Sequence, residues 1–343
     1  MEGFGNILKA ELFKLVKGKA LVKLIVALII IFVVFTILFN FLYELAGEVL
    51  NNTTATGGEV TKEAVEIAKA NYDEAVKQNE SLNAYRKMTN TNVYQTKAVY
   101  NLYKYMYENN VSTSSISMFG VITDVSANSY ITFMMDIMAT IFAIFGIVTM
   151  IKSFAGERSN GTLKMQLLRP VSKDAIIIGK LLATLIVSIG ALIFMFVVTC
   201  VVGVIAFKVN ASQVIGILNG EKAFMLSPAG AIIITLLYHI TYVSQFIVLG
   251  LFVSSLMKKN GGGSIAIGLV ILLIGSNVEQ LLGYIFVGYI GINLNISWMN
   301  ALTLNGPSLN YMNLYSMLGI SILWFAGMLT ASILMFRKED IHS

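Results

Sequence analysis

Three ionisable side chains lie inside long apolar stretches of the sequence: Asp136, His239 and Glu279. An acid or base in the hydrocarbon region of a membrane is costly, so such a residue marks a functional site by default. We take these three as candidates for a substrate path. The alternative interpretation places each acid near the outer interface, facing a polar cap or a helix neighbour, and makes the histidine a hydrogen-bonded packing residue.

The sequence motifs of common catalytic sites are missing. There is no GxxxxGK[ST] phosphate loop, since Gly18-Lys19 and Gly179-Lys180 lack the rest of the pattern, and neither HExxH nor GxSxG occurs. A single cysteine, Cys200, excludes a disulfide framework and a thiolate metal site. We therefore expect no catalytic residue, no bound cofactor and no metal site in this chain.

The composition is that of a protein embedded in a bilayer. Of 343 residues, 56% are hydrophobic and 13% are charged, and the mean hydropathy is +0.75. Soluble domains are about 25% charged, so a cytosolic enzyme and a disordered chain are excluded. A transmembrane helix needs ~20 apolar residues. Six stretches qualify, namely residues 24–43, 129–151, 181–207, 231–257, 264–286 and 315–336. The predicted fold is an all-α membrane protein with six transmembrane helices.

Basic residues predict the orientation of these helices. If both termini are inside, fifteen of the 24 Lys and Arg residues fall in inner segments. Positive charge concentrates on the cytoplasmic side of membrane proteins, so an N-in, C-in topology is favoured. The net charge of +5 is then explained by topology, and we expect no nucleic-acid partner.

The segments between the spans have distinct characters. Residues 1–23 are predicted to form an amphipathic helix on the inner membrane surface, with lysines opposite its apolar face. Residues 44–128 are predicted to form an extracellular helical hairpin, and residues 287–314 short re-entrant helices in the outer leaflet. The other connections are an extracellular loop at 208–230, a short cytoplasmic loop at 258–263 and a cytoplasmic tail at 337–343.

Three tyrosines fall on one face of the second helix of this hairpin: Tyr100, Tyr103 and Tyr107. In one interpretation they pack against the first helix or rest on the membrane interface. In the other they offer an aromatic surface to an amphipathic substrate.

The inner segment 152–180 holds six of the fifteen inner basic residues. Gly156 and Gly161 bracket a short polar turn, and a small amphipathic helix parallel to the membrane is predicted to follow. We expect Glu157 and Arg158 to be exposed next to apolar side chains. Such a surface is suited to docking a cytosolic partner.

A longer pattern runs through this segment: an acid, Gly-Thr-Leu, a leucine pair, Pro-Val-Ser and a Gly-Lys that opens the third span. The residues are Phe154, Glu157, Gly161, Thr162, Leu163, Leu167, Leu168, Pro170, Val171, Ser172, Gly179 and Lys180. The pattern resembles the signature of type-2 ABC transporter permeases, in a form similar to members from low-GC Gram-positive bacteria. The N-terminal helix with Glu11, the six spans and the cytoplasmic termini are also similar to that family.

The resemblance implies a permease in the bacterial plasma membrane that forms a dimer, more often of identical subunits. It would pair with two copies of a separate cytosolic ATPase, which uses ATP and Mg. The first and fifth spans of the two protomers would line the path. The implied coupling residues are Phe154, Glu157, Arg158, Gly161, Thr162, Leu163, Leu167 and Pro170, with Glu11 and Lys14 of the N-terminal helix as a second contact.

The outer segment 44–128 is longer than in many permeases of that family. Its length favours export of peptides or amphipathic drugs, as in antimicrobial resistance, over export of polysaccharides. Two other functions stay open. One is an ion-coupled secondary transporter, since Asp136 and Glu279 occupy the second span of each three-span half. The other is a sensor or resistance component that binds an extracellular peptide without moving it.

Overall fold

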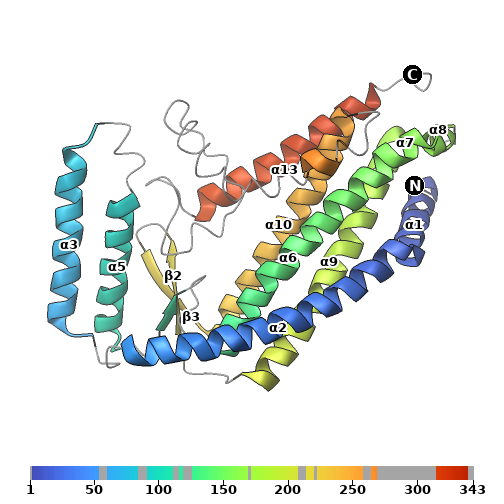
Figure 1. Ribbon diagram of the computed structural model, residues 1–343. Coiled ribbons are helices and arrows are strands. Elements are labelled where there is room, and N and C mark those ends of the chain that lie inside the picture. Colours follow the sequence, from blue (N-terminus) through green and yellow to red (C-terminus); the bar gives the residue numbers. More distant parts are fainter. Residues whose placement is uncertain are drawn as a thin grey trace.

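The computed structural model of the chain consists mainly of long helices (Figure 1). It describes residues 2–53, 60–83, 91–110, 116–118, 126–168, 171–207, 214–219, 222–257, 263, 265–268 and 314–338. Among these residues, five helices are long and apolar enough to cross a membrane. They are α2 (Lys19–Thr53), α6 (Ala127–Ile151) with its extension, α9 (Lys173–Ala206), α10 (Pro228–Leu256) and α13 (Leu314–Arg337).

A mostly helical, multi-pass membrane protein is therefore confirmed. The predicted fifth span and the outer-leaflet helices, residues 264–286 and 287–314, lie almost entirely outside the described residues. Six spans thus remain a prediction, and so does the N-in, C-in topology.

Two helix boundaries differ from those predicted. α1 (Glu2–Lys17) is separated from α2 by the single residue Gly18. α2 ends at Thr53, ten residues past the predicted end of the first span at residue 43. The added stretch contains no proline to stop the helix. α6 likewise continues through a π-helical turn, η2 (Lys152–Gly156), into α7 (Glu157–Ser159). The inner segment therefore starts as an extension of a span.

Serine caps set the starts of three spans. Ser126, Ser172 and Ser227 each accept a hydrogen bond from the backbone N–H three residues on, at the start of α6, α9 and α10. A cap of this kind satisfies one of the unpaired N–H groups of the first turn. Pro228 follows the third serine at the first helical position, where its missing N–H costs nothing.

α6 is the most buried of the spans and packs against both α9 and α10. Its fully buried side chains include Tyr130, Met134, Met138, Phe142, Ile147 and Met150. Glycines let α6 and α10 approach closely: a Cβ atom on Gly146 would lie 2.4 Å from Cγ1 of Ile247. A Cβ atom on Gly250 would lie 3.1 Å from the backbone of Ile147. Small residues at such crossings allow the van der Waals packing that holds membrane helices together.

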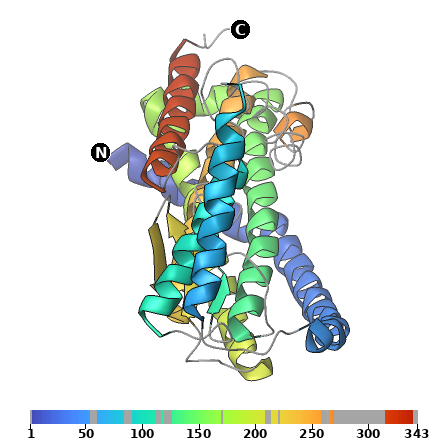
Figure 2. The same cartoon turned by 90° about the vertical axis from the view of Figure 1, so that its left-hand side faces the viewer.

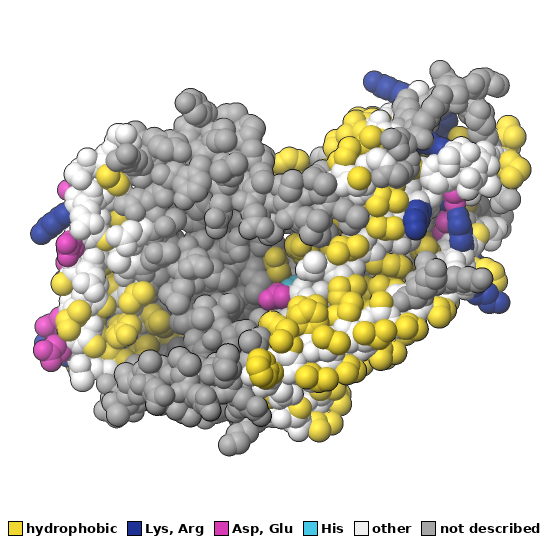
Figure 3. Space-filling view, in the orientation of Figure 1, with side chains coloured by type: hydrophobic (Ala, Val, Ile, Leu, Met, Phe, Trp, Pro, Cys, Tyr) yellow, Lys and Arg dark blue, Asp and Glu magenta, His cyan; other side chains and the backbone are white. Residues whose placement is uncertain are grey.

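The outside of the bundle is apolar. Large exposed side chains cover α2, α9 and α13, among them Ile30, Val34, Ile37, Phe194, Ile205 and Leu323. Figure 3 shows this hydrophobic surface, with basic side chains toward the end that holds α1 and α7. α2 lies at one edge of the bundle (Figure 2), where Phe35 and Phe39 pack on α6 and much of its remaining surface is exposed. Exposed apolar surface of this extent is what lipid or a partner subunit covers.

A helical hairpin lies at the opposite end of the bundle from α1 and α7 (Figure 1). It consists of α3 (Lys62–Glu80) and α5 (Thr91–Glu108), which pack against each other. Its small core is made of Val60, Leu102 and Met106. These are the two helices expected within residues 44–128.

A small sheet beside this hairpin was not predicted. β1 (Ile116–Met118) pairs in parallel with β2 (Val214–Asn219), and β2 pairs in antiparallel with β3 (Lys222–Leu226). The register places Ile116 opposite Val214, and Ile215 opposite Leu226. The segment 208–230, predicted as a loop, therefore contains a strand hairpin. The all-α prediction missed it because strands this short carry a weak sequence signal.

Replacing Gly146 by alanine should destabilise the contact between α6 and α10. The added methyl group would overlap Ile247, and overpacking of this kind costs about 1–3 kcal/mol. We expect a lower thermal unfolding midpoint for the detergent-purified protein. The control is Gly190→Ala, where nothing lies within 4 Å of the new atom. Equal midpoints for the two variants would contradict the packing described here.

Candidate functional site

A cluster of four charged side chains, three of them buried, lies where α1, α7 and α9 meet. Lys180 of α9 has no exposed side-chain surface. Its Nζ atom donates to Oε1 of Glu11 at 2.5 Å and to Oε2 of Glu157 at 2.7 Å. Both carboxylates are themselves buried. We call Glu11, Lys14, Glu157 and Lys180 the charge cluster.

The fourth member of the charge cluster balances its charge. Lys14 pairs with Oε1 of Glu157 and lies 3.9 Å from Oε2 of Glu11. Two lysines and two glutamates sum to zero, and Gln166 donates a further hydrogen bond to Glu157 at 3.1 Å. Buried ions are tolerated only when each is paired and hydrogen-bonded in this way. The charge cluster therefore holds three elements in one arrangement.

Local sequence brings these charges together. A Cβ atom on Gly179 would lie 2.8 Å from Cγ2 of Ile7, so the glycine before Lys180 lets α1 lie against α9. Glu157 follows directly after the π-helical turn, a feature that recurs at functional sites. Phe154, in that turn, is buried beneath the lysine, with its ring centroid 5.9 Å from Nζ.

Arg158 ties the same turn to two other spans. Its Nη1 atom donates to the backbone oxygen of Ser254 at 2.8 Å, and its guanidinium lies 6.0 Å from the ring centroid of Phe336. The expectation that Glu157 and Arg158 are exposed is thus wrong for Glu157, which is buried, and only half right for Arg158. Charges in a short polar turn suggest solvation, but here each one meets a partner from a distant element.

The amphipathic helix after the turn provides the exposed surface instead. In α8 (Thr162–Leu167) and the residue after it, Met165 is 64% exposed and Leu168 is 75% exposed. Leu163 is buried and Leu167 half-buried, so they seat the helix. Pro170 lies outside the described residues.

The backbone around α8 fits this seating. Gly161 has a φ of +73°, a conformation that side-chain-bearing residues rarely adopt, and it allows the turn between α7 and α8. Thr162 donates to the backbone oxygen of Glu157 at 3.2 Å. Gly161 and Thr162 therefore shape the turn that leads into α8, and their contact with an ATPase stays a prediction.

The intramembrane candidates lie elsewhere, on α6 and α10. Asp136 and His239 lie side by side, with Oδ1 of the acid 3.3 Å from Nε2 of the imidazole. The histidine is buried, whereas the acid is 57% exposed. Glu279 lies outside the described residues, so its place in the path remains a prediction.

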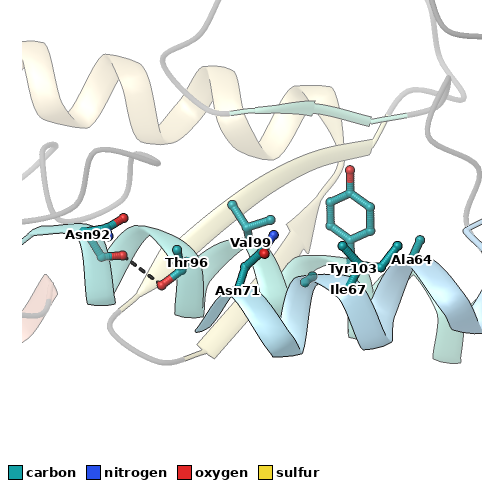
Figure 4. Close-up of a pocket in the computed structure, with 8 residues that line it drawn as sticks. Ala64, Ile67, Asn71, Asn92, Thr96, Val99 and Tyr103 are labelled. Carbon is teal, nitrogen blue, oxygen red and sulfur yellow. Dashed lines mark hydrogen bonds between the residues drawn. The ribbon is translucent and has the colours of Figure 1, made fainter. Parts of the chain in front are cut away.

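The helical hairpin of α3 and α5 contains a cavity of about 450 Å³. Figure 4 shows it between the two helices, with Asn71 on one helix and Thr96 and Tyr103 on the other. Tyr100 instead stacks on Tyr72, with ring centroids 6.3 Å apart. Packing against the first helix is therefore confirmed for Tyr100, whereas Tyr103 lines the cavity and an aromatic surface for a substrate stays a prediction.

No metal centre is found among the described residues, where no three His, Cys, Asp or Glu side chains are grouped to hold an ion. Glu157 was assigned from the sequence to the coupling segment and Glu11 and Lys14 to a second contact, but the binding of both glutamates to Lys180 was not predicted. The signal that could have found it is a lysine eight residues into a long apolar helix, directly after a glycine. Gln166 and Ser254 carried no such signal.

Comparison with known proteins gives one match. Residues 5–341 match the family model described as ABC-2 family transporter protein. A search of curated proteins found no match. The match covers nearly the whole chain, including α1, the charge cluster and the pair formed by Asp136 and His239.

Replacing Lys180 by methionine should strongly destabilise the protein. The change leaves two buried carboxylates facing one another, and breaking a buried ion pair costs about 3–5 kcal/mol. We expect a large drop in the thermal unfolding midpoint in detergent. Adding Glu11→Gln to Lys180→Met should recover part of it, because one unpaired charge is removed. Lys9→Met, on the exposed side of α1, is the matched control. A similar small effect for Lys9→Met and Lys180→Met would refute the assigned role of the charge cluster.

Proposed function

The chain belongs to the ABC-2 transporter family, and from this premise we propose that it is the permease subunit of an ATP-driven exporter. A separate cytosolic subunit would hydrolyse ATP with Mg, and the substrate would be a peptide or an amphipathic drug. The observation that carries the proposal is the charge cluster at the base of the spans, next to a short helix that exposes apolar side chains. This arrangement is suited to a segment that contacts a cytosolic subunit and transmits the movement of that subunit to the spans.

The exposed part of α8 is the proposed docking surface. Met165 and Leu168 present apolar area to the surroundings, while Leu163 beneath them is fixed in the core. A partner that presses on these two residues would displace α8 as a unit. The predicted coupling residues thus have two roles: those of α8 contact the ATPase, and Glu157 transmits the movement of α8 to the spans.

Transmission would follow the covalent and ionic connections of the turn. α7 continues α6 through the π-helical turn, and Glu157 binds Lys180 of α9 as well as Lys14 of α1. Movement of α8 would therefore reach three elements together. Alternating exposure of the path to the two sides of the membrane would result from shifts of α6 and α9 against α10.

We also propose that two copies of this chain pair in the bacterial plasma membrane, each with one ATPase subunit. The apolar face of α2 supports this, because its 18-residue apolar window is only 11% buried within a single chain. A second protomer and lipid would share that surface. A dimer of identical chains is the simplest arrangement that covers it.

A sensor or resistance component is the second candidate function. The observation that favours it is the cavity of about 450 Å³ between α3 and α5, which has both amide and aliphatic walls. Such a cavity could bind part of a peptide at the end of the bundle opposite α8. Peptide binding with no ATP-dependent movement of that peptide would favour this function over export.

Leu168→Glu should weaken assembly with the ATPase without unfolding the permease. The side chain is 75% exposed, so the change costs little in the isolated chain but places a charge on an apolar docking surface. We expect loss of co-purification and of permease-stimulated ATP turnover. Tyr107→Glu, at the other end of the molecule and also exposed, is the control and should leave both unchanged.

Glu157→Gln tests the transmission step in the same assay. It should allow assembly but reduce stimulated ATP turnover, because Lys180 and Lys14 lose a charged partner. Normal stimulation in both Leu168→Glu and Glu157→Gln would contradict the proposed coupling. A chain that recruits no ATP-hydrolysing subunit would overturn the proposed function as a whole.

A further inference from the structure

The pair formed by Asp136 and His239 lies within two of the apolar spans, α6 and α10. Asp136 comes nine residues after the start of α6, and His239 comes eleven residues after the start of α10. At 1.5 Å per residue these positions are about 14 Å and 16 Å from the helix starts. Both side chains therefore lie well inside helices that are long and apolar enough to cross a hydrocarbon region about 30 Å thick.

The two side chains have opposite surroundings. His239 is 1% exposed, and neither of its ring nitrogens has a hydrogen-bond partner among the described residues, although the acid lies 3.3 Å away. Asp136 points outward with more than half of its side chain exposed. The backbone oxygen of Asp136 accepts from Thr140 at 3.0 Å, but its carboxylate accepts no hydrogen bond from the residues that the structure describes. A buried polar group with unmet bonds needs an explanation.

No opposite charge in the described part of the spans compensates the carboxylate. In α2, α6, α9, α10 and α13, the other acidic and basic side chains that the structure describes lie toward the helix ends. The charge cluster is closed on itself and neutral. An acid within an apolar span that belongs to no neutral ion-pair network is suited to bind a positively charged ligand.

The neighbouring residues indicate what kind of charge that is. The ring of Tyr238 lies 5.0 Å from that of His239, and the ring of Tyr242 lies 6.0 Å from that of Tyr238. Both tyrosines are half-buried. The tyrosines thus adjoin His239, whose Nε2 lies 3.3 Å from the carboxylate, and aromatic faces attract organic cations through cation–π contacts. A small inorganic cation would require more oxygen ligands than this one acid supplies.

We propose that Asp136 and His239 form an intramembrane binding site for a lipophilic organic cation, in which the carboxylate pairs with the positive group and the tyrosine rings contact the apolar body. This rests on the proposed export of amphipathic compounds and narrows them to cationic ones. Asp136 is the binding residue. His239 is a positioning residue, because its Nε2 atom lies 3.3 Å from one carboxylate oxygen and can donate to it when a ligand orders the acid.

Binding of tetraphenylphosphonium to the full chain in lipid nanodiscs tests the site. This probe is permanently charged and lipophilic, so its own protonation does not vary. We expect saturable binding to the wild type. Asp136→Asn should raise the Kd roughly ten-fold or more, as is typical when a charged contact is lost. His239→Gln should raise it less, and Asp136→Glu should retain most of the affinity.

Two controls separate charge at the site from general effects. Glu66→Gln removes one acid from the exposed face of α3 and should bind the probe like the wild type. A neutral analogue, triphenylphosphine oxide, should compete poorly. Equal affinity of the wild type and Asp136→Asn, equal competition by the neutral analogue, or no binding to the wild type would each overturn the proposal.

A measurement on the unaltered chain keeps the test independent of variant folding. Dicyclohexylcarbodiimide modifies carboxyl groups in apolar surroundings, and tetraphenylphosphonium should protect Asp136 from it, as read by mass spectrometry. Modification that is unaffected by the probe would contradict the site. None of these measurements needs an ATPase, so loss of ATP-driven activity with intact cation binding would count against the proposed function alone.

Discussion

Lys180 places a positive charge where its side chain has no contact with solvent, and much of the inner half of the molecule follows from that charge. Water cannot solvate it, so protein carboxylates must, and a single carboxylate would leave other donor positions of the ammonium unused. Glu11 and Glu157 come from different elements, which are drawn together around one nitrogen atom. With two glutamates around one lysine the net charge is −1, and the half-exposed Lys14 brings the charge cluster back to neutrality. α1, the extension of α6 and the start of α9 are thereby fixed relative to one another.

Sequence reasoning found what depends on local composition. The long apolar helices follow from length and hydropathy, and the helices of the outer hairpin from their uninterrupted polar–apolar pattern. It failed where the deciding partner is remote. Glu157 was expected to be solvated because its neighbours in sequence are polar, yet its partner Lys180 lies on another helix and Glu11 is 169 residues from that lysine. The strands were missed for the same reason, since Ile116–Met118 becomes a strand only when paired with residues 214–216. Asp136 and His239 were each recognised by residue type, but their proximity is a property of how α6 packs on α10.

The two polar places within the spans differ in a way that bears on their roles. At the charge cluster every ion has a partner of opposite sign, and Gly179 allows α1 to pack closely on α9 beside it. Asp136 and His239 have unsatisfied polar groups: the acid is exposed, and both imidazole nitrogens lack a hydrogen bond among the described residues. A closed network stiffens a structure, whereas an open one has free energy available for a ligand. The first therefore suits transmission of force and the second suits binding.

The pairing of β1 with β2 constrains how the protein is made. The register joins Ile116 to Val214, so one strand emerges from the ribosome 98 residues before the other, and both α6 and α9 lie between them in the chain. β2 and β3 must reach the same side of the membrane as β1 before the sheet closes, which requires that two spans have already been inserted. Met225 of β3 packs on the small core of α3 and α5, so that core is also completed late. During biosynthesis, the sheet and the hairpin core can therefore be completed only after α6 and α9 have been inserted. Until then the edge of β1 is unpaired and accessible to chaperones or proteases.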